Sequence, residues 1–275
     1  MTKTKTKTTT DRDQIVEWLD TLLNTKTIKD YSCNGLQVQG SDTVTRIGFT
    51  VDASMQSYEA AVDNDCQMLI AHHGIIWGGI KSITGTVYNQ IQYLMESDLN
   101  LYASHLPLDL HAKVGNNIQL AGMLGLSKVK PFGFYDGIEI GYEGVLASKT
   151  DRSKLVALLC NSLETECSIL PFGKEQIRTV GVFSGGGGHE LSQAIEKRLD
   201  CYITGEGSHI NYHAALEAGI NVIYAGHYHT EKTGVLALSK LMKKELGIDT
   251  VFLDLPPIVE RQSYGDTIDD EQDDE

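Results

Sequence analysis

The order of apolar segments constrains the fold of this 275-residue chain more than any other feature. Three short apolar segments, Arg46–Asp52, Gln67–Ala71 and Leu99–Ser104, are typical of buried strands, and helix patterns over 54–64 and 87–95 separate them. Ser54 is placed to cap the first of these helices. Strands that alternate with helices form a mostly parallel sheet with helices on its faces, so we predict an α/β fold.

The second half of the chain repeats this order. It has strand patterns at Thr179–Ser184, Cys201–Thr204, Ile220–Ala225 and Thr250–Leu255, and helix patterns over 189–199, 214–218 and 233–246. LNLYASH at 99–105 is similar to INVIYAGH at 220–227, and a carboxylate follows each closing histidine four residues later. We therefore expect two similar lobes that arose by internal duplication, each with a mixed, mostly parallel sheet.

We divide the chain into a first lobe over 12–127 and a second lobe over 128–258. The connecting part of the second lobe, 128–177, has a strand pattern at Glu139–Ala147 and a helix pattern at Arg152–Leu163. Residues 1–11 and 259–275 are poor in apolar residues that could pack, so we expect two disordered tails. Seven acidic residues in the last ten supply about half of the formal charge of −14.

Composition excludes several classes of protein. The chain remains acidic without its last ten residues, which makes a nucleic-acid partner unlikely. No apolar run is long enough to span a bilayer. The five cysteines include no Cys-x-x-Cys pair, and the N-terminal MTKTKTKTTT has no apolar targeting segment. We expect a cytoplasmic protein with reduced thiols.

Histidines and carboxylates gather at the carboxyl ends of the predicted strands, where α/β proteins bind ligands. The residues concerned are His72, His73, Asp109, His227 and Glu231. Alone, the His72-His73 pair indicates a surface turn, and His227 with Glu231 indicates an ion pair at a helix start. Because these groups meet at one sheet edge, we favour a two-metal site in which a carboxylate bridges the ions.

Two further features leave alternatives open. Gly185–Gly188 could cradle a phosphate on backbone amides, or could form a tight turn that lets the lobes approach. Four aromatic residues, Trp77, Phe132, Phe134 and Tyr135, could lie in an interface between subunits or in the core of a lobe. Trp77 could instead wall the metal site and stack on a base.

The motifs of this chain resemble the Ngg-one-interacting-factor-three family, also called GTP cyclohydrolase I type 2-like proteins. The resemblance covers about residues 12–258 and rests on NGLQVQG at 34–40, AHHG at 71–74, SHLPLD at 104–109, TGE at 204–206 and GHYHTE at 226–231. It implies two α/β lobes with a dimetal site in the cleft between them. The implied ligands are His72, His73, Asp109, His227 and Glu231. His105 would lie beside the metals, either supporting the ligands or carrying a proton.

The resemblance also implies a function. It suggests two divalent ions per chain, Zn, Fe or Mn, and a hydrolase for a nucleotide-like substrate. One implied activity is that of a GTP cyclohydrolase, which opens the imidazole ring of guanine and releases formate. The alternative is a non-catalytic metal-binding scaffold or regulatory protein that acts through partners. The family further implies a homo-oligomer, namely a hexamer.

Overall fold

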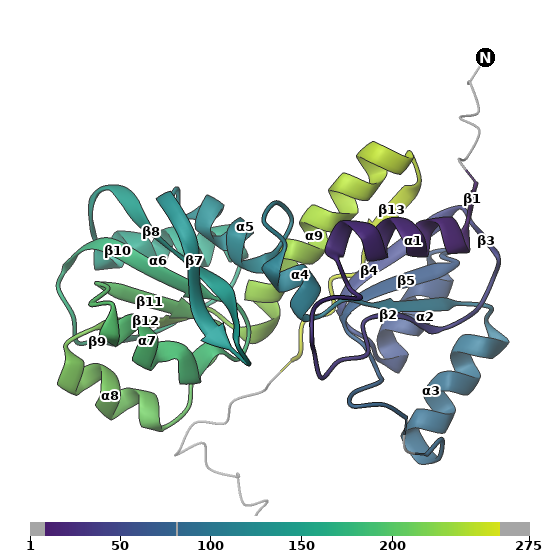
Figure 1. Cartoon of the computed structure of the whole chain (residues 1–275), viewed down its shortest axis with the longest axis horizontal. Coiled ribbons are helices and arrows are strands. Elements are labelled where there is room, and N and C mark those ends of the chain that lie inside the picture. The colour runs from purple at the N-terminus through teal and green to yellow at the C-terminus, as the bar shows by residue number, and fades with distance from the viewer. Residues whose placement is uncertain (1–8, 81, 259–275) are drawn as a thin grey trace, which may run out of the picture.

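Two α/β lobes lie side by side in the computed structural model, which describes residues 9–80 and 82–258 (Figure 1). The predicted α/β class is confirmed. The predicted tails at 1–8 and 259–275 lie outside the described residues. No helix in the described part of the chain combines the length and apolar character that crossing a membrane requires.

The first sheet has five strands in the order β13-β4-β5-β6-β2. Its strands are β2 (Gly35–Val38), β4 (Arg46–Asp52), β5 (Met68–His73), β6 (Asn100–Ala103) and β13 (Asp249–Phe252). Only β2 is antiparallel to its neighbour. The helices of this lobe are α1 (Arg12–Leu23), α2 (Met55–Asp63) and α3 (Gly85–Glu96). Ser54 caps α2 as expected, because its hydroxyl accepts a hydrogen bond from the amide of Ser57.

The second sheet has six strands in the order β7-β8-β10-β11-β12-β9. Its strands are β7 (Ser127–Tyr135), β8 (Ile138–Asp151), β9 (Ser168–Pro171), β10 (Gln176–Phe183), β11 (Cys201–Thr204) and β12 (Asn221–Tyr224). Only β10, β11 and β12 run parallel to one another, so this sheet is less parallel than expected. The lobe also contains α6 (Arg152–Leu163), the 3-10 helix η1 (Gly187–Glu190), α7 (Leu191–Glu196) and α8 (Ile210–Ala218).

Three helices lie where the lobes meet: α4 (Leu106–Leu110), α5 (Asn116–Met123) and α9 (His227–Leu246) (Figure 1). Each lobe receives a helix from the other half of the sequence. Leu238 and Met242 of α9 are buried in the core of the first lobe, while Leu120 of α5 is buried in the core of the second. The strand after α9, β13, pairs with β4. The boundary drawn at residue 128 therefore does not separate the two lobes, because α5 and α9 exchange sides.

Two local expectations need correction. Thr10 and Asp11 were placed in a disordered tail, but they form β1, which pairs with β3 (Thr43–Val44), and the Asp11 carboxylate caps α1. Helix α9 begins at His227 rather than at residue 233. The earlier start places His227 and Glu231 one turn apart on the same helix face, where both side chains can address one ion.

Candidate metal centre

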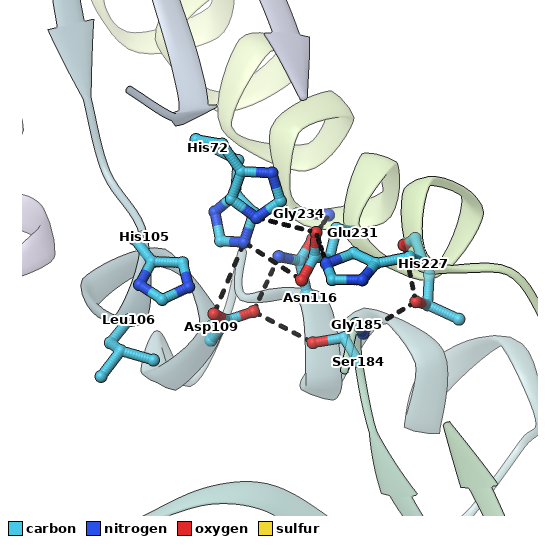
Figure 2. A network of polar contacts seen from close by, with 12 residues as sticks. His72, His105, Leu106, Asp109, Asn116, Ser184, Gly185, His227, Glu231 and Gly234 are labelled. Carbon is cyan, nitrogen blue, oxygen red and sulfur yellow. Dashed lines mark hydrogen bonds and ion pairs between the residues drawn. The ribbon is translucent and has the colours of Figure 1, made fainter. Parts of the chain in front are cut away.

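The structure brings the six histidines and carboxylates singled out in the sequence together in one place. Figure 2 labels all of them except His73. They come from the end of β5, the segment from the end of β6 through α4, and the first turns of α9. His72 is completely buried, and Asp109 and Glu231 are each 4% exposed. Ionisable groups buried this deeply require partners of opposite charge or a metal ion.

The Nδ1 atoms of the two β5 histidines are held by acceptors. His72 Nδ1 donates a hydrogen bond of 2.8 Å to the backbone carbonyl of Ser104, and His73 Nδ1 lies 2.8 Å from the Asp52 carboxylate. A carbonyl can only accept, so the proton of neutral His72 resides on Nδ1. The Nε2 lone pair of each ring is then left to face the centre of the cluster, as metal-binding histidines require.

His105 and His227 follow the same arrangement. His105 Nδ1 lies 3.0 Å from Asp30, and His227 Nδ1 lies 3.0 Å from Glu206. Burial raises the pKa of the Asp30 carboxyl, but hydrogen bonds from His105 and Asn34 outweigh it and lower the value to about 2. Asp30 therefore stays ionised and holds a proton on His105 Nδ1.

The Glu231 carboxylate lies between two sets of nitrogen and oxygen atoms. Its Oε2 is 3.1 Å from Nε2 of both His73 and His227, and its Oε1 is 3.6 Å from Nε2 of His72. Asp109 Oδ2 lies 3.5 Å from the same His72 nitrogen. One ion could be held by His73, His227 and one Glu231 oxygen, and a second by His72, Asp109 and the other oxygen.

Unpaired polar atoms show that this donor set fits a cation. Among the described residues, His72 Nε2 and Glu231 Oε2 are buried atoms with no hydrogen-bond partner. Burial lowers the pKa of His73, but Asp52 and Glu231 raise it to about 10. The Glu231 carboxylate, at 3.1 Å, raises the pKa of His227 to about 9 despite burial. The carboxylates thus draw positive charge into the site, which bound divalent ions would supply.

A hydrogen-bond network fixes Asp109 and joins the lobes. The second oxygen of the Asp109 carboxylate, Oδ1, accepts hydrogen bonds from Asn116 Nδ2 at 2.8 Å and Ser184 Oγ at 3.0 Å (Figure 2). Asn116 Oδ1 in turn accepts from the backbone amide of Gly234 on α9. A Cβ at Gly234 would lie 2.6 Å from that amide oxygen, so only glycine permits this approach. Asp109 is therefore positioned by three elements at once.

The glycine run after β10 is explained by the same crowding. A Cβ at Gly185, whose φ is +64°, would lie 2.0 Å from Glu231 Oε1. The Gly185 amide already donates to the Thr230 hydroxyl at 2.9 Å. The close-approach interpretation of Gly185–Gly188 is therefore favoured over a phosphate cradle.

A cavity of about 360 Å³ opens beside the cluster and is lined by residues of both lobes. Trp77 lines it with its ring centroid 5.1 Å from that of His105, which agrees with a wall of the site. Tyr135 also lines the cavity, and Phe134 is exposed. Phe132 is completely buried and packs in the core of the second lobe. The interface alternative is therefore wrong for this residue.

Sequence reasoning missed the side chains that orient the histidines. Asp52 ends the predicted strand 46–52, and Glu206 belongs to the TGE motif, so strand ends and motifs carried a signal for both. Asn116 lies in the GNN sequence at 115–117. Asp30 lies in a loop, 75 residues before His105, and no local pattern marks it. Only the fold reveals that contact.

A buried cluster of imidazoles and carboxylates at the meeting of two α/β lobes defines a candidate metal-binding protein. The comparison with known families agrees: residues 10–257 match the model of the Duf34/NIF3 (NGG1p interacting factor 3) family, and the chain belongs to it.

Relatives and solved structures cover nearly the whole chain. A protein from Archaeoglobus fulgidus, named GTP cyclohydrolase 1 type 2 homolog, is 43% identical over 88% of this chain and 97% of its own. One from Pyrococcus abyssi with the same name is 42% identical over 90% and 98%. The structure of TTHA1606 from Thermus thermophilus is 35% identical, with a TM-score of 0.84, over 91% of this chain and 100% of that one.

Proposed function

We propose that this protein is a dinuclear-metal-dependent hydrolase. His72, His73, Asp109, His227 and Glu231 would hold two divalent ions of Zn, Fe or Mn, and the two oxygens of Glu231 would let it serve both. The observation that carries the proposal is the convergence of the Nε2 atoms and carboxylate oxygens, with Glu231 Oε2 at 3.1 Å from two imidazoles, beside an open cavity. Divalent ions bound there would acidify water and polarise the bond to be cleaved.

His105 is proposed to move the proton. Its Nδ1 is committed to Asp30 at 3.0 Å, so Nε2 is the atom that can accept a proton from water and return it to a leaving group. Asp30 stabilises the imidazolium that forms, because its own carboxyl remains ionised. His105 and Trp77 line the same cavity, so a substrate held there lies beside the proton carrier.

The substrate we propose is nucleotide-like, and GTP is the leading candidate because relatives carry the name GTP cyclohydrolase 1 type 2 homolog. Two waters would hydrolyse the two C–N bonds of guanine C8. The imidazole ring would open and C8 would leave as formate. A volume of about 360 Å³ falls within the range of small-molecule sites.

Turnover of nucleotides by the metal-loaded protein tests this function. The protein would be incubated with GTP, ATP and simpler phosphoesters, while released formate and phosphate are measured. We expect turnover of at least one substrate and a loss of about 10²–10⁴-fold in His105→Ala, the usual contribution of a general acid or base. A protein that binds two metals and turns over no substrate would instead support the alternative, a metal-binding scaffold.

We also propose an internal duplication. Each half contains a helix and an antiparallel edge strand, α1-β2 or α6-β9, followed by three parallel strands with helices between them. The histidine after the third strand of each half lies four residues before a carboxylate of the cluster. This correspondence supports an origin in which each ancestral copy supplied one such carboxylate, Asp109 or Glu231, to the site.

We propose that the chain forms a homo-oligomer, and a hexamer is the form that the family resemblance favours. Several apolar side chains on α3 and the loop before it are exposed, namely Ile80, Ile83, Tyr88 and Met95. A second copy of the chain could bury them, and light scattering would then give a multiple of 30.2 kDa. We propose a cytoplasmic location because all five cysteines are free thiols.

A further inference from the structure

The cavity beside the metal centre contains a carboxylate that the proposed metal site does not use. Glu190 ends η1, lines the cavity and is only 8% exposed. Within residues 9–80 and 82–258, no hydrogen bond or ion pair connects its side chain to another residue. Its own backbone amide is the donor that reaches the carboxylate, so most of the acceptor capacity of this cavity-lining side chain stays free for a ligand.

Glu143, another buried glutamate of the second lobe, has ionic partners. Burial in this lobe therefore does not by itself leave a glutamate without a partner residue. Glu143 is 6% exposed, and its carboxylate contacts Lys130 at 2.6 Å and Lys197 at 3.0 Å. Burial raises the pKa of Glu190, whereas the two lysines lower that of Glu143 despite burial. A buried carboxylate whose acceptor sites are only partly filled costs free energy unless a ligand supplies donors.

The other walls of the cavity suit a flat ring. Trp77 comes from the first lobe, Tyr135 and Phe183 come from the second, and Ile140 adds an aliphatic surface. Aromatic faces bind planar heterocycles by stacking, and they leave the edge of the ring free for hydrogen bonds. Glu190 and His105 line this same space, so a ring edge at Glu190 leaves the rest of the molecule near the metal ligands.

We propose that Glu190 selects substrates by accepting two adjacent N–H donors from the edge of a planar ring, as the N1–H and 2-amino groups of guanine present them. The inference rests on the proposed function, because it assigns the substrate class of the same cavity. An ionised carboxylate offers two acceptor oxygens and no donor. The Glu190 carboxylate can accept two hydrogen bonds from guanine but only the N1–H bond from hypoxanthine. The N1 atom of adenine is itself an acceptor, so it repels the carboxylate.

Glutamine at position 190 would change this preference in a defined way. Its side-chain amide offers one acceptor and one donor, which match the N1–H and 6-oxo groups that guanine and hypoxanthine share. Glu190→Gln should therefore bind both bases about equally, because the advantage of the 2-amino group is lost. A hydrogen bond to a charged group is worth about 10–100-fold in affinity, so wild-type protein should prefer guanine by that factor.

Equilibrium binding tests the inference without relying on turnover. Calorimetry on the metal-loaded full chain would compare GTP, ITP and ATP, which differ in the base edge. The matched control is Glu196→Gln, because Glu196 lies on α7 close in sequence but is exposed. We expect a GTP-to-ITP preference of about 10–100-fold in wild type and in Glu196→Gln, and a preference near one in Glu190→Gln.

The outcomes separate this inference from the proposed function. Equal affinity of wild-type protein for the three nucleotides, or an unchanged preference in Glu190→Gln, overturns the role of Glu190, even if nucleotides are hydrolysed. Guanine-selective binding that depends on Glu190, without turnover, supports the inference and contradicts the hydrolase. If Glu190→Gln fails to fold, the wild-type preference alone is used: a GTP-to-ITP preference of about 10–100-fold supports the inference, and equal affinity overturns it.

Discussion

Replacing Glu231 with glutamine should remove metal from the site more completely than any substitution outside the ligand set. The carboxylate faces both proposed ions, with Oε2 at 3.1 Å from the Nε2 atoms of His73 and His227 and Oε1 at 3.6 Å from that of His72. In Glu231→Gln, an amide replaces one oxygen, and its N–H groups donate to the lone pairs that would bind metal. Loss of an outer-shell partner costs about 10–100-fold in affinity, so loss of this bridging ligand should cost more than about 100-fold.

Elemental analysis of protein purified without added metal or chelator measures this effect. The control is Glu245→Gln, which removes the same charge from an exposed position on the same helix, α9. We expect two metals per chain in wild type and in Glu245→Gln, and fewer than one in Glu231→Gln. His105→Ala should keep most of its metal. Two metals at full occupancy in Glu231→Gln would refute the bridging role.

Three further predictions test the supporting structure. Asp52→Asn should weaken metal affinity about 10–100-fold, as competition with a chelator would show, because Asp52 holds the His73 ring; an unchanged affinity would contradict this role. Glu143→Gln should cost roughly 1 kcal/mol at pH 7 in urea unfolding. Burial raises the pKa of Glu143 but its two lysines lower it, so the cost should decline as the pH falls below about 4 and vanish only below the lowered pKa of the folded state. A cost that stays constant as the pH is lowered through the acid range would contradict an ionic cause. Asp11→Ala should destabilise the chain by about 1 kcal/mol through loss of the α1 cap, whereas a variant as stable as wild type would show that the cap is dispensable.

The sequence identified the candidate ligands because each lies at a strand end or a helix start, where a local pattern is visible. His72 and His73 end an apolar strand, and His227 follows another. What no local pattern could show is how the two halves meet. That depends on β13 pairing with β4, a contact between strands about 200 residues apart in the sequence. Such long-range pairing is set by tertiary packing rather than by local propensity.

The supporting side chains were harder to predict for the same reason. Gly185 and Gly234 occupy an ordinary loop and a helix, and their lack of a Cβ is needed only because Glu231 and Asn116 approach them from elsewhere. Glu190 gave no sequence signal either. Its proposed role rests on its place in the wall of the cavity and on the lack of a bond to any other residue within the described part of the chain, which only the folded chain can show.

Anomalous diffraction from crystals of the protein as purified is the most direct measurement of the central claim. The account predicts two peaks, one bounded by His73, His227 and Glu231 and the other by His72, Asp109 and Glu231. Their separation should be about 3.5–4 Å, as in two-metal hydrolytic sites. A single peak at full occupancy, or peaks that no Glu231 oxygen contacts, would contradict a dinuclear centre bridged by this residue.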